Sequence, residues 1–185
     1  MMLRAVNSDM PMFPTVFING QRMVESGAII ELILDRYASD QLRPNVESSL
    51  YPDYLMWMHY AEGTMAARLF SDYRQWRRET PTARSPLIDS EATVQFAENY
   101  LQEHDYFGGE EFSAADIMML FPLNVATVLN LVDEAQFPAV QDWKSRVTKR
   151  PAYVRMLEAA RPDGMLGSLP PVEARPPSKR AVLPL

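Results

Sequence analysis

The sequence has no cysteine, only 2 histidines and no long apolar run among its 185 residues. The lack of cysteine excludes disulfides, thiolate metal sites and a cysteine nucleophile. No apolar run approaches the roughly 20 residues of a membrane-spanning helix, and no signal-peptide pattern opens the chain. The formal net charge of -6 argues against general nucleic-acid binding, which normally uses a basic face. We therefore expect a soluble cytoplasmic protein with no metal site and no membrane or nucleic-acid partner.

Apolar residues recur at helical spacing through most of the chain. With 47% hydrophobic and 23% charged residues, the chain can bury a core in one or two small domains. The predicted helices cover residues 50–78, 88–104, 137–150 and 151–160. The first of them has an apolar stripe made of Tyr54, Met58, Ala61, Met65 and Leu69. The apolar face of the second contains Ala92, Phe96 and Tyr100.

The segment from Phe13 to Ile30 predicts two short strands followed by a helix. Residues 15–18 are β-branched or aromatic, as in a largely buried strand. Asn19 and Gly20 form a strong hairpin signal because both tolerate positive φ. Residues 21–24 should therefore form a second strand that pairs antiparallel to the first.

The helix after this hairpin begins with a pair of residues suited to an amino-acid head group. Ser26 is expected at the N-cap, where its hydroxyl and the free amides of the first turn suit a carboxylate. Glu25 beside it could hold an ammonium group. Helix capping alone also explains such a pair. Pro14, however, marks a turn or a cis peptide, which would turn the backbone of Phe13 toward a ligand.

A second motif, Ser-x-x-Asp, lies at Ser113 and Asp116, directly before the apolar run 117–121. This spacing is that of a capping box, in which the hydroxyl and the carboxylate each satisfy an unpaired amide. By itself it predicts only that a helix starts here.

In this order, the features from Phe13 to Ile30 resemble the C-terminal half of the glutathione-binding, thioredoxin-like domain of cytosolic glutathione S-transferases. In that family the residue before a cis-proline binds the cysteinyl part of glutathione through its backbone, and a Glu/Gln-Ser pair holds the γ-glutamyl end. The resemblance assigns these glutathione-binding roles to Phe13, Pro14, Glu25 and Ser26. The capping box resembles that of the central helix in the family's all-α domain, a folding element, so we expect a buried structural carboxylate there.

The resemblance implies an α+β, mostly α fold. Residues 1–37 would form a partial thioredoxin-like domain, a β-hairpin plus a helix, and residues 50–160 an all-helical C-terminal domain. Residues 38–49 would link them, and 161–185 would form a proline-rich tail, extended or disordered. Family members usually begin with a strand-helix-strand unit of about 30 or more residues. We expect the chain to be N-terminally truncated, without that unit.

The expected truncation leaves the catalytic residue unassigned. The missing unit normally carries the Tyr, Ser or Cys that stabilises the glutathione thiolate. In the family, the long helix at 50–78 lines both the cleft and the dimer interface. His59 and Glu62 on this helix are therefore candidates for cleft or cross-dimer contacts, with a plain interface or solvated position as the alternative. We expect a homodimer through the helices at 50–78 and 88–104.

The resemblance implies a glutathione S-transferase-like protein with glutathione as co-substrate. If active, it would conjugate the glutathione thiolate to a small hydrophobic electrophile. We expect weak or absent turnover because no residue matches the catalytic one. The alternative is a non-catalytic scaffold or regulatory protein with the same fold. Binding to immobilised glutathione would separate the two hypotheses.

Overall fold

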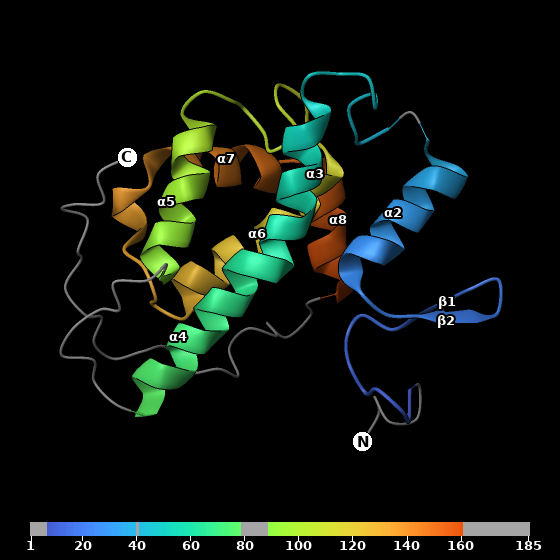
Figure 1. Ribbon diagram of the computed structural model, residues 1–185, viewed down its shortest axis with the longest axis horizontal. Helices are drawn as coiled ribbons and strands as arrows, with labels where there is room; N and C mark the ends of the chain where they lie inside the picture. The colour runs from blue at the N-terminus through green and yellow to red at the C-terminus, as the bar shows by residue number, and fades with distance from the viewer. Residues whose placement is uncertain (1–6, 40, 79–88, 161–185) are drawn as a thin grey trace.

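The computed structural model describes residues 7–39, 41–78 and 89–160, and the proline-rich tail lies outside them. A small hairpin and the helix after it lie beside a cluster of helices (Figure 1), which confirms the expected mostly α fold class. The elements are β1 (Val16–Ile18), β2 (Gln21–Met23), α2 (Ser26–Tyr37), α3 (Tyr51–Tyr60), the π-helix η1 (Ala61–Ala66), α4 (Ala67–Arg78), α5 (Ser90–Leu101), α6 (Ala114–Val128), the 3-10 helix η2 (Glu134–Gln136), α7 (Pro138–Thr148) and α8 (Pro151–Ala160). None of the described helices combines the length and the apolar run that a bilayer crossing requires.

The predicted hairpin is present. β1 and β2 pair antiparallel, with Ile18 opposite Gln21 across the turn. Asn19 and Gly20 have φ values of 51° and 80°, as the turn chemistry requires. The expectation of a largely buried strand is wrong, because Phe17 in the middle of β1 is 60% exposed. Within the described residues the sheet has two strands, so too little structure surrounds it to cover both faces.

The long helix predicted at 50–78 is three consecutive segments, α3, η1 and α4. In the π-helical middle segment, the amide of Ala67 donates to the carbonyl of Glu62, five residues back. All five residues of the predicted apolar stripe are buried. Ser48 supports the start of α3, because its hydroxyl accepts a hydrogen bond of 3.2 Å from the amide of Leu50.

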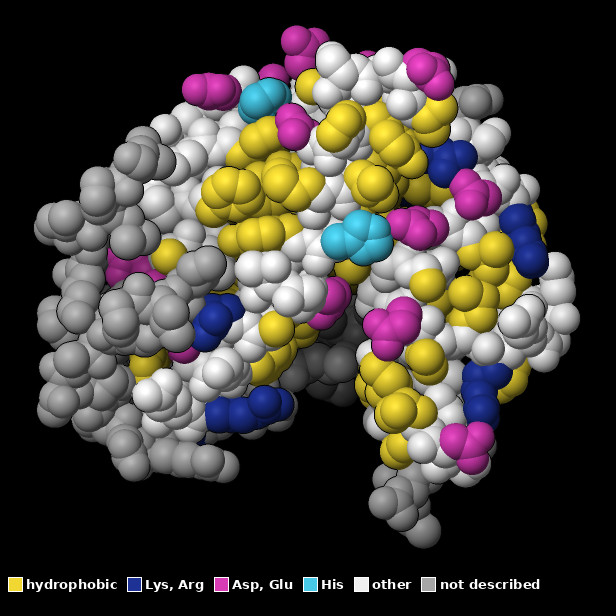
Figure 2. Space-filling view, in the orientation of Figure 1, with side chains coloured by type: hydrophobic (Ala, Val, Ile, Leu, Met, Phe, Trp, Pro, Cys, Tyr) yellow, Lys and Arg dark blue, Asp and Glu magenta, His cyan; other side chains and the backbone are white. Residues whose placement is uncertain are grey.

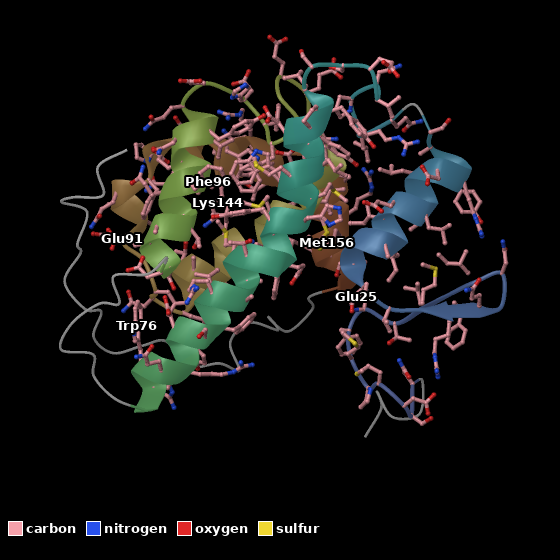
Figure 3. All side chains as sticks on the ribbon, viewed as in Figure 1. Glu25, Trp76, Glu91, Phe96, Lys144 and Met156 are labelled. Carbon is pink, nitrogen blue, oxygen red and sulfur yellow. The ribbon has the colours of Figure 1, made fainter. Side chains whose placement is uncertain are left out.

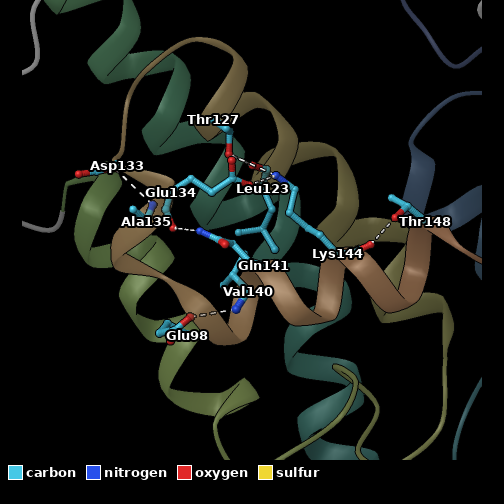
Figure 4. Close-up of polar contacts among 10 residues, drawn as sticks. All are labelled: Glu98, Leu123, Thr127, Asp133, Glu134, Ala135, Val140, Gln141, Lys144 and Thr148. Carbon is cyan, nitrogen blue, oxygen red and sulfur yellow. Dashed lines mark hydrogen bonds and ion pairs between the residues drawn. The ribbon is translucent and has the colours of Figure 1, made fainter.

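The apolar face predicted for the next helix is not the face that α5 buries most fully. Phe96 is 44% exposed, whereas the polar residues Ser90 and Glu98 are buried on the opposite face of α5. Both polar side chains have partners from distant segments. The Ser90 hydroxyl donates to Asp72 at 2.6 Å, and the Glu98 carboxylate accepts from the amide of Val140 at 2.9 Å, at the start of α7 (Figure 4). Hydrogen bonds to such partners remove most of the cost of burying polar groups.

The central helix α6 contacts α2, α3, η1, α4 and α5. It begins with the capping box of Ser113 and Asp116, and it contains Pro122. Asp116 is fully buried, as expected. Its carboxylate accepts hydrogen bonds from the amides of Phe107 and Ser113, from the Ser113 hydroxyl and from the Trp143 indole. Burial raises the pKa of Asp116, and these donors oppose that rise.

The segment between α2 and α3 is attached to the start of α6. The amide of Ala114 donates to the carbonyl of Leu42 at 2.7 Å. The side chain of Leu42 packs against the core, and Arg43 forms an ion pair of 2.6 Å with Asp35 on α2. These contacts fix the end of α2 relative to the helical cluster.

Candidate functional site

The candidate site starts at the turn before β1. The peptide bond between Phe13 and Pro14 is cis. The turn is shaped by a hydrogen bond of 2.7 Å from the Thr15 hydroxyl to the Met12 carbonyl. The Phe13 side chain is 73% exposed, and the backbone of Phe13 has no hydrogen bond to any described residue. Its N–H and C=O are therefore available to a peptide ligand.

The first turn of α2 provides the second part of the site. The prediction that Ser26 is the N-cap is wrong by one residue, because the N-cap is Glu25, with φ 74° and ψ 108°. The Glu25 carbonyl accepts the first helical hydrogen bond, 3.0 Å from the Ile29 amide. Ser26 is thus the first helical residue, half-buried, and its hydroxyl has no hydrogen bond within the part of the chain that the structure describes. The hydroxyl and the free amides of this turn remain available to a carboxylate.

Glu25 and Glu62 form an acidic pair beside this turn. Partial burial raises the pKa of Glu62, and the nearby negative charge of Glu25 raises it further. Glu25 lies at the start of α2, on the side that faces the helical cluster (Figure 3). The structure therefore brings the candidates Glu25, Ser26 and Glu62 into one region. Two carboxylates whose charges repel each other would be stabilised by an ammonium group between them.

The two histidines occupy different parts of the molecule. His59 is 71% exposed, and its Nε2 atom is 4.0 Å from the Glu31 carboxylate on α2. His104 stacks on Tyr100, with ring centroids 4.1 Å apart, at the far end of α5. His59 is thus positioned between α3 and α2, and the structure does not place His104 near the candidate site.

Sequence reasoning missed an apolar surface on the outer side of α6. Ile117, Phe121 and Val128 recur at helical spacing there and are 42%, 44% and 43% exposed. The Phe121 ring lies 6.4 Å from that of Phe70 on α4, measured between centroids. Figure 2 shows a hollow between the α4 side of the molecule and the hairpin and α2 side. The sequence did contain a signal for this surface, because apolar residues recur on both faces of α6. Packing in the core requires an apolar face on one side only.

A separate open cavity of about 840 Å³ lies where the end of α5 meets the start of α7. Its lining includes Glu98, His104, Asp142 and Arg146. The Glu98 carboxylate is already engaged by the amides at the start of α7. None of the predicted glutathione-binding residues lines this cavity.

Comparison with known proteins shows what this arrangement is similar to. Residues 83–151 match the family model of the glutathione S-transferase C-terminal domain. The chain is 24% identical over 155 residues to glutathione S-transferase 3 of Schizosaccharomyces pombe. That match covers 75% of this chain and 64% of the yeast protein, so the chain spans less than two thirds of that relative.

Solved structures show the same fold. A glutathione S-transferase from Actinobacillus pleuropneumoniae superimposes with a TM-score of 0.74 at 21% identity, covering 91% of this chain and 77% of that one. Glutathione S-transferase 1-6 from Anopheles dirus species B gives a TM-score of 0.70 at 22% identity, covering 85% and 75%. Both similarities include the hairpin side as well as the helices, since they cover more of the chain than the helical cluster alone. The chain therefore has the fold of the glutathione S-transferases, with its thioredoxin-like and all-α parts, and residues 83–151 match the C-terminal domain of that family.

Proposed function

We propose that this chain binds glutathione at the first turn of α2 and presents its thiolate to a small hydrophobic electrophile. The observation that carries the proposal is the unused hydroxyl and free amides at Ser26, next to the acidic pair of Glu25 and Glu62. The γ-glutamyl carboxylate would accept from Ser26 and the amides, while its ammonium group would lie near the two carboxylates. The backbone of Phe13, which has no hydrogen bond to any described residue, supports backbone pairing with the cysteinyl residue.

The electrophile would lie on the exposed apolar surface of α6. Phe121 and Ile117, with Phe70 across from them, offer a flat, apolar contact for its body. Holding a thiolate and an electrophile side by side accelerates their reaction by proximity. We assign no catalytic residue. The alternative function remains a non-catalytic scaffold or regulatory protein that uses this fold as an interaction surface.

A cytoplasmic homodimer fits the proposed function. Leu55 and Met56 on α3 are each 38% exposed, and Phe96 on α5 is 44% exposed, so both helices present apolar side chains to solvent. We propose that α3, α4 and α5 form the dimer interface. We also propose the domain division expected above, 1–37, 38–49, 50–160 and 161–185. Sedimentation of a monomeric mass at micromolar concentration would contradict the dimer.

Calorimetric titration with glutathione tests the binding site. Ser26→Ala should weaken binding by about tenfold or more, because a hydrogen bond to a charged group contributes about 1.5–3 kcal/mol. Ser39→Ala is the matched control, since Ser39 is exposed at the other end of α2, and it should bind like the wild type. A conjugation assay with a chlorodinitrobenzene then measures turnover. A folded wild-type chain that binds no glutathione would favour the scaffold function.

A further inference from the structure

The helix α4 carries two arginines on the same face as Phe70. Arg74 and Arg77 follow Phe70 at i+4 and i+7, and residues at these spacings share one side of a helix. Both arginines are exposed. Leu69, a buried residue, and Trp76, which is 9% exposed, belong to the side that packs in the core. Phe70, which is half-buried, and the exposed Arg74 and Arg77 thus form one row along α4.

The positive charge of this row is not neutralised within the described ranges. Neither Arg74 nor Arg77 has an ion pair or hydrogen bond there, in contrast to Arg22 and Arg43, which pair with aspartates at 2.8 Å and 2.6 Å. The acidic residue of α4, Asp72, is buried and bound to α5. Figure 2 shows Lys and Arg side chains on the α4 side of the hollow. In a chain with a net charge of -6, this row is a local exception.

The row joins the apolar surface at its Phe70 end. Phe70 faces Phe121 across 6.4 Å, and Ile117 is one turn before Phe121 on α6. With a rise of about 1.5 Å per residue, Arg74 and Arg77 lie roughly 6 and 10 Å from Phe70 along the axis of α4. Cations are favoured near a helix C-terminus, and this explains why an arginine occurs in the last turn. The same effect favours no particular face of the helix, so it does not explain why both arginines lie on one face. The position of both arginines on the Phe70 face calls for a further reason.

We propose that the electrophile site selects ligands with a flat apolar body and a negatively charged group about 6 to 10 Å from it, held by Arg74 and Arg77. The apolar body rests on Phe70 and Phe121, and the anionic group meets the guanidinium groups, which suit carboxylate, sulfonate or phosphate oxygens. As a statement about the reaction, this inference depends on the proposed function. As a statement about binding, it concerns the cleft alone and does not require glutathione.

Two fluorescent probes with the same aromatic framework test the charge preference. The anionic probe is 1-anilinonaphthalene-8-sulfonate, and the neutral probe is N-phenyl-1-naphthylamine, which lacks the sulfonate. The full chain should bind both probes. The double variant Arg74→Gln/Arg77→Gln should bind the anionic probe with an affinity about tenfold lower, whereas its affinity for the neutral probe should change by less than about twofold. Added salt should weaken only the anionic probe. The control Arg36→Gln/Lys149→Gln removes the same charge from α2 and from the end of α7, and it should leave both affinities unchanged.

A second pair of variants tests where the probes bind. Phe121→Ala should weaken both probes, whereas Phe96→Ala should weaken neither, because both phenylalanines are 44% exposed but Phe96 lies on α5 against Trp57. Thermal unfolding of each variant checks that it is folded. Equal loss of both probes in the arginine variant, or no loss of either, would overturn the proposal, as would a folded wild type that binds neither. If the probes behave as expected but glutathione fails to bind, charge selection stands and the proposed conjugation fails.

Discussion

Replacement of Asp116 with asparagine would show how strongly the fold depends on one buried carboxylate. One carboxylate oxygen accepts from the Phe107 amide at 3.0 Å and the Trp143 indole at 2.7 Å. The other accepts from Ser113, 2.7 Å from its amide and 3.0 Å from its hydroxyl. An asparagine has one acceptor oxygen and an amino group that only donates. If the amino group faces the Phe107 amide and the Trp143 indole, both lose their acceptor. If it faces Ser113, the Ser113 amide loses its acceptor, whereas the hydroxyl can turn and accept from the amino group.

The expected cost follows from the one or two donors that lose their acceptor. A buried donor left without a partner costs about 1–3 kcal/mol, so Asp116→Asn should lower the free energy of unfolding by about 1–6 kcal/mol. That is a large part of the roughly 5–15 kcal/mol that stabilises a typical domain. Ser113→Ala removes only the hydroxyl of the capping box and should cost about 0.5–2 kcal/mol.

Urea unfolding followed by circular dichroism measures both values. Asp142→Asn is the control, because Asp142 is exposed on α7 and the substitution removes the same charge. Its unfolding free energy should stay within about 0.5 kcal/mol of the wild type. The reasoning would be refuted if Asp116→Asn cost no more than this control, since the four donors would then have found other partners at little cost.

Three further predictions concern other parts of the helical cluster and the site. Glu98→Gln leaves one amide at the start of α7 without its carboxylate acceptor, so urea unfolding should show a loss of about 1–3 kcal/mol. Gly109→Ala should lower the melting temperature, because Gly109 has φ 106° and a Cβ there would lie 2.7 Å from Leu50; an unchanged melting temperature would contradict this. The pKa of Glu62 is raised above 4.5 in the folded state by burial and by Glu25, so its protonated form adds stability at low pH that is lost as pH rises through the folded-state pKa. Glu62→Gln should therefore gain stability relative to the wild type between about pH 4 and pH 7, measured by urea unfolding at each pH, and a constant difference would count against the acidic pair.

Much of the fold could be predicted because it follows local patterns. The hairpin depends on Asn19 and Gly20, whose tolerance of positive φ is visible in the sequence. The helices predicted at 137–150 and 151–160 are present as α7 and α8, which begin at Pro138 and Pro151 because proline suits the first helical position. The spacing of Ser113 and Asp116 identified a capping box, since all its bonds form within one turn.

The errors concern properties set by distant residues or by a single dihedral angle. The buried face of α5 depends on Asp72, which is 18 residues from Ser90, and on amides more than 40 residues from Glu98. The spacing of apolar residues in the sequence cannot reveal hydrogen-bond partners that are so distant along the chain. The start of α2 depends on the positive φ of Glu25, which few glutamates adopt. The π-helical segment that carries Glu62 has no simple sequence signal, so its proximity to Glu25 became visible only in the structure.

The hydrogen bond from the Ala114 amide to the Leu42 carbonyl determines how this protein can be dissected. A fragment that starts at the long helix would leave the first turn of α6 with an open amide and would remove the Leu42 side chain from the core. Gly109 lies against Leu50, so the same cut would also place a free chain end beside the loop before α6. An independently folding helical fragment should thus begin no later than residue 41. The helical domain expected at residues 50–160 therefore needs most of the preceding linker in order to fold.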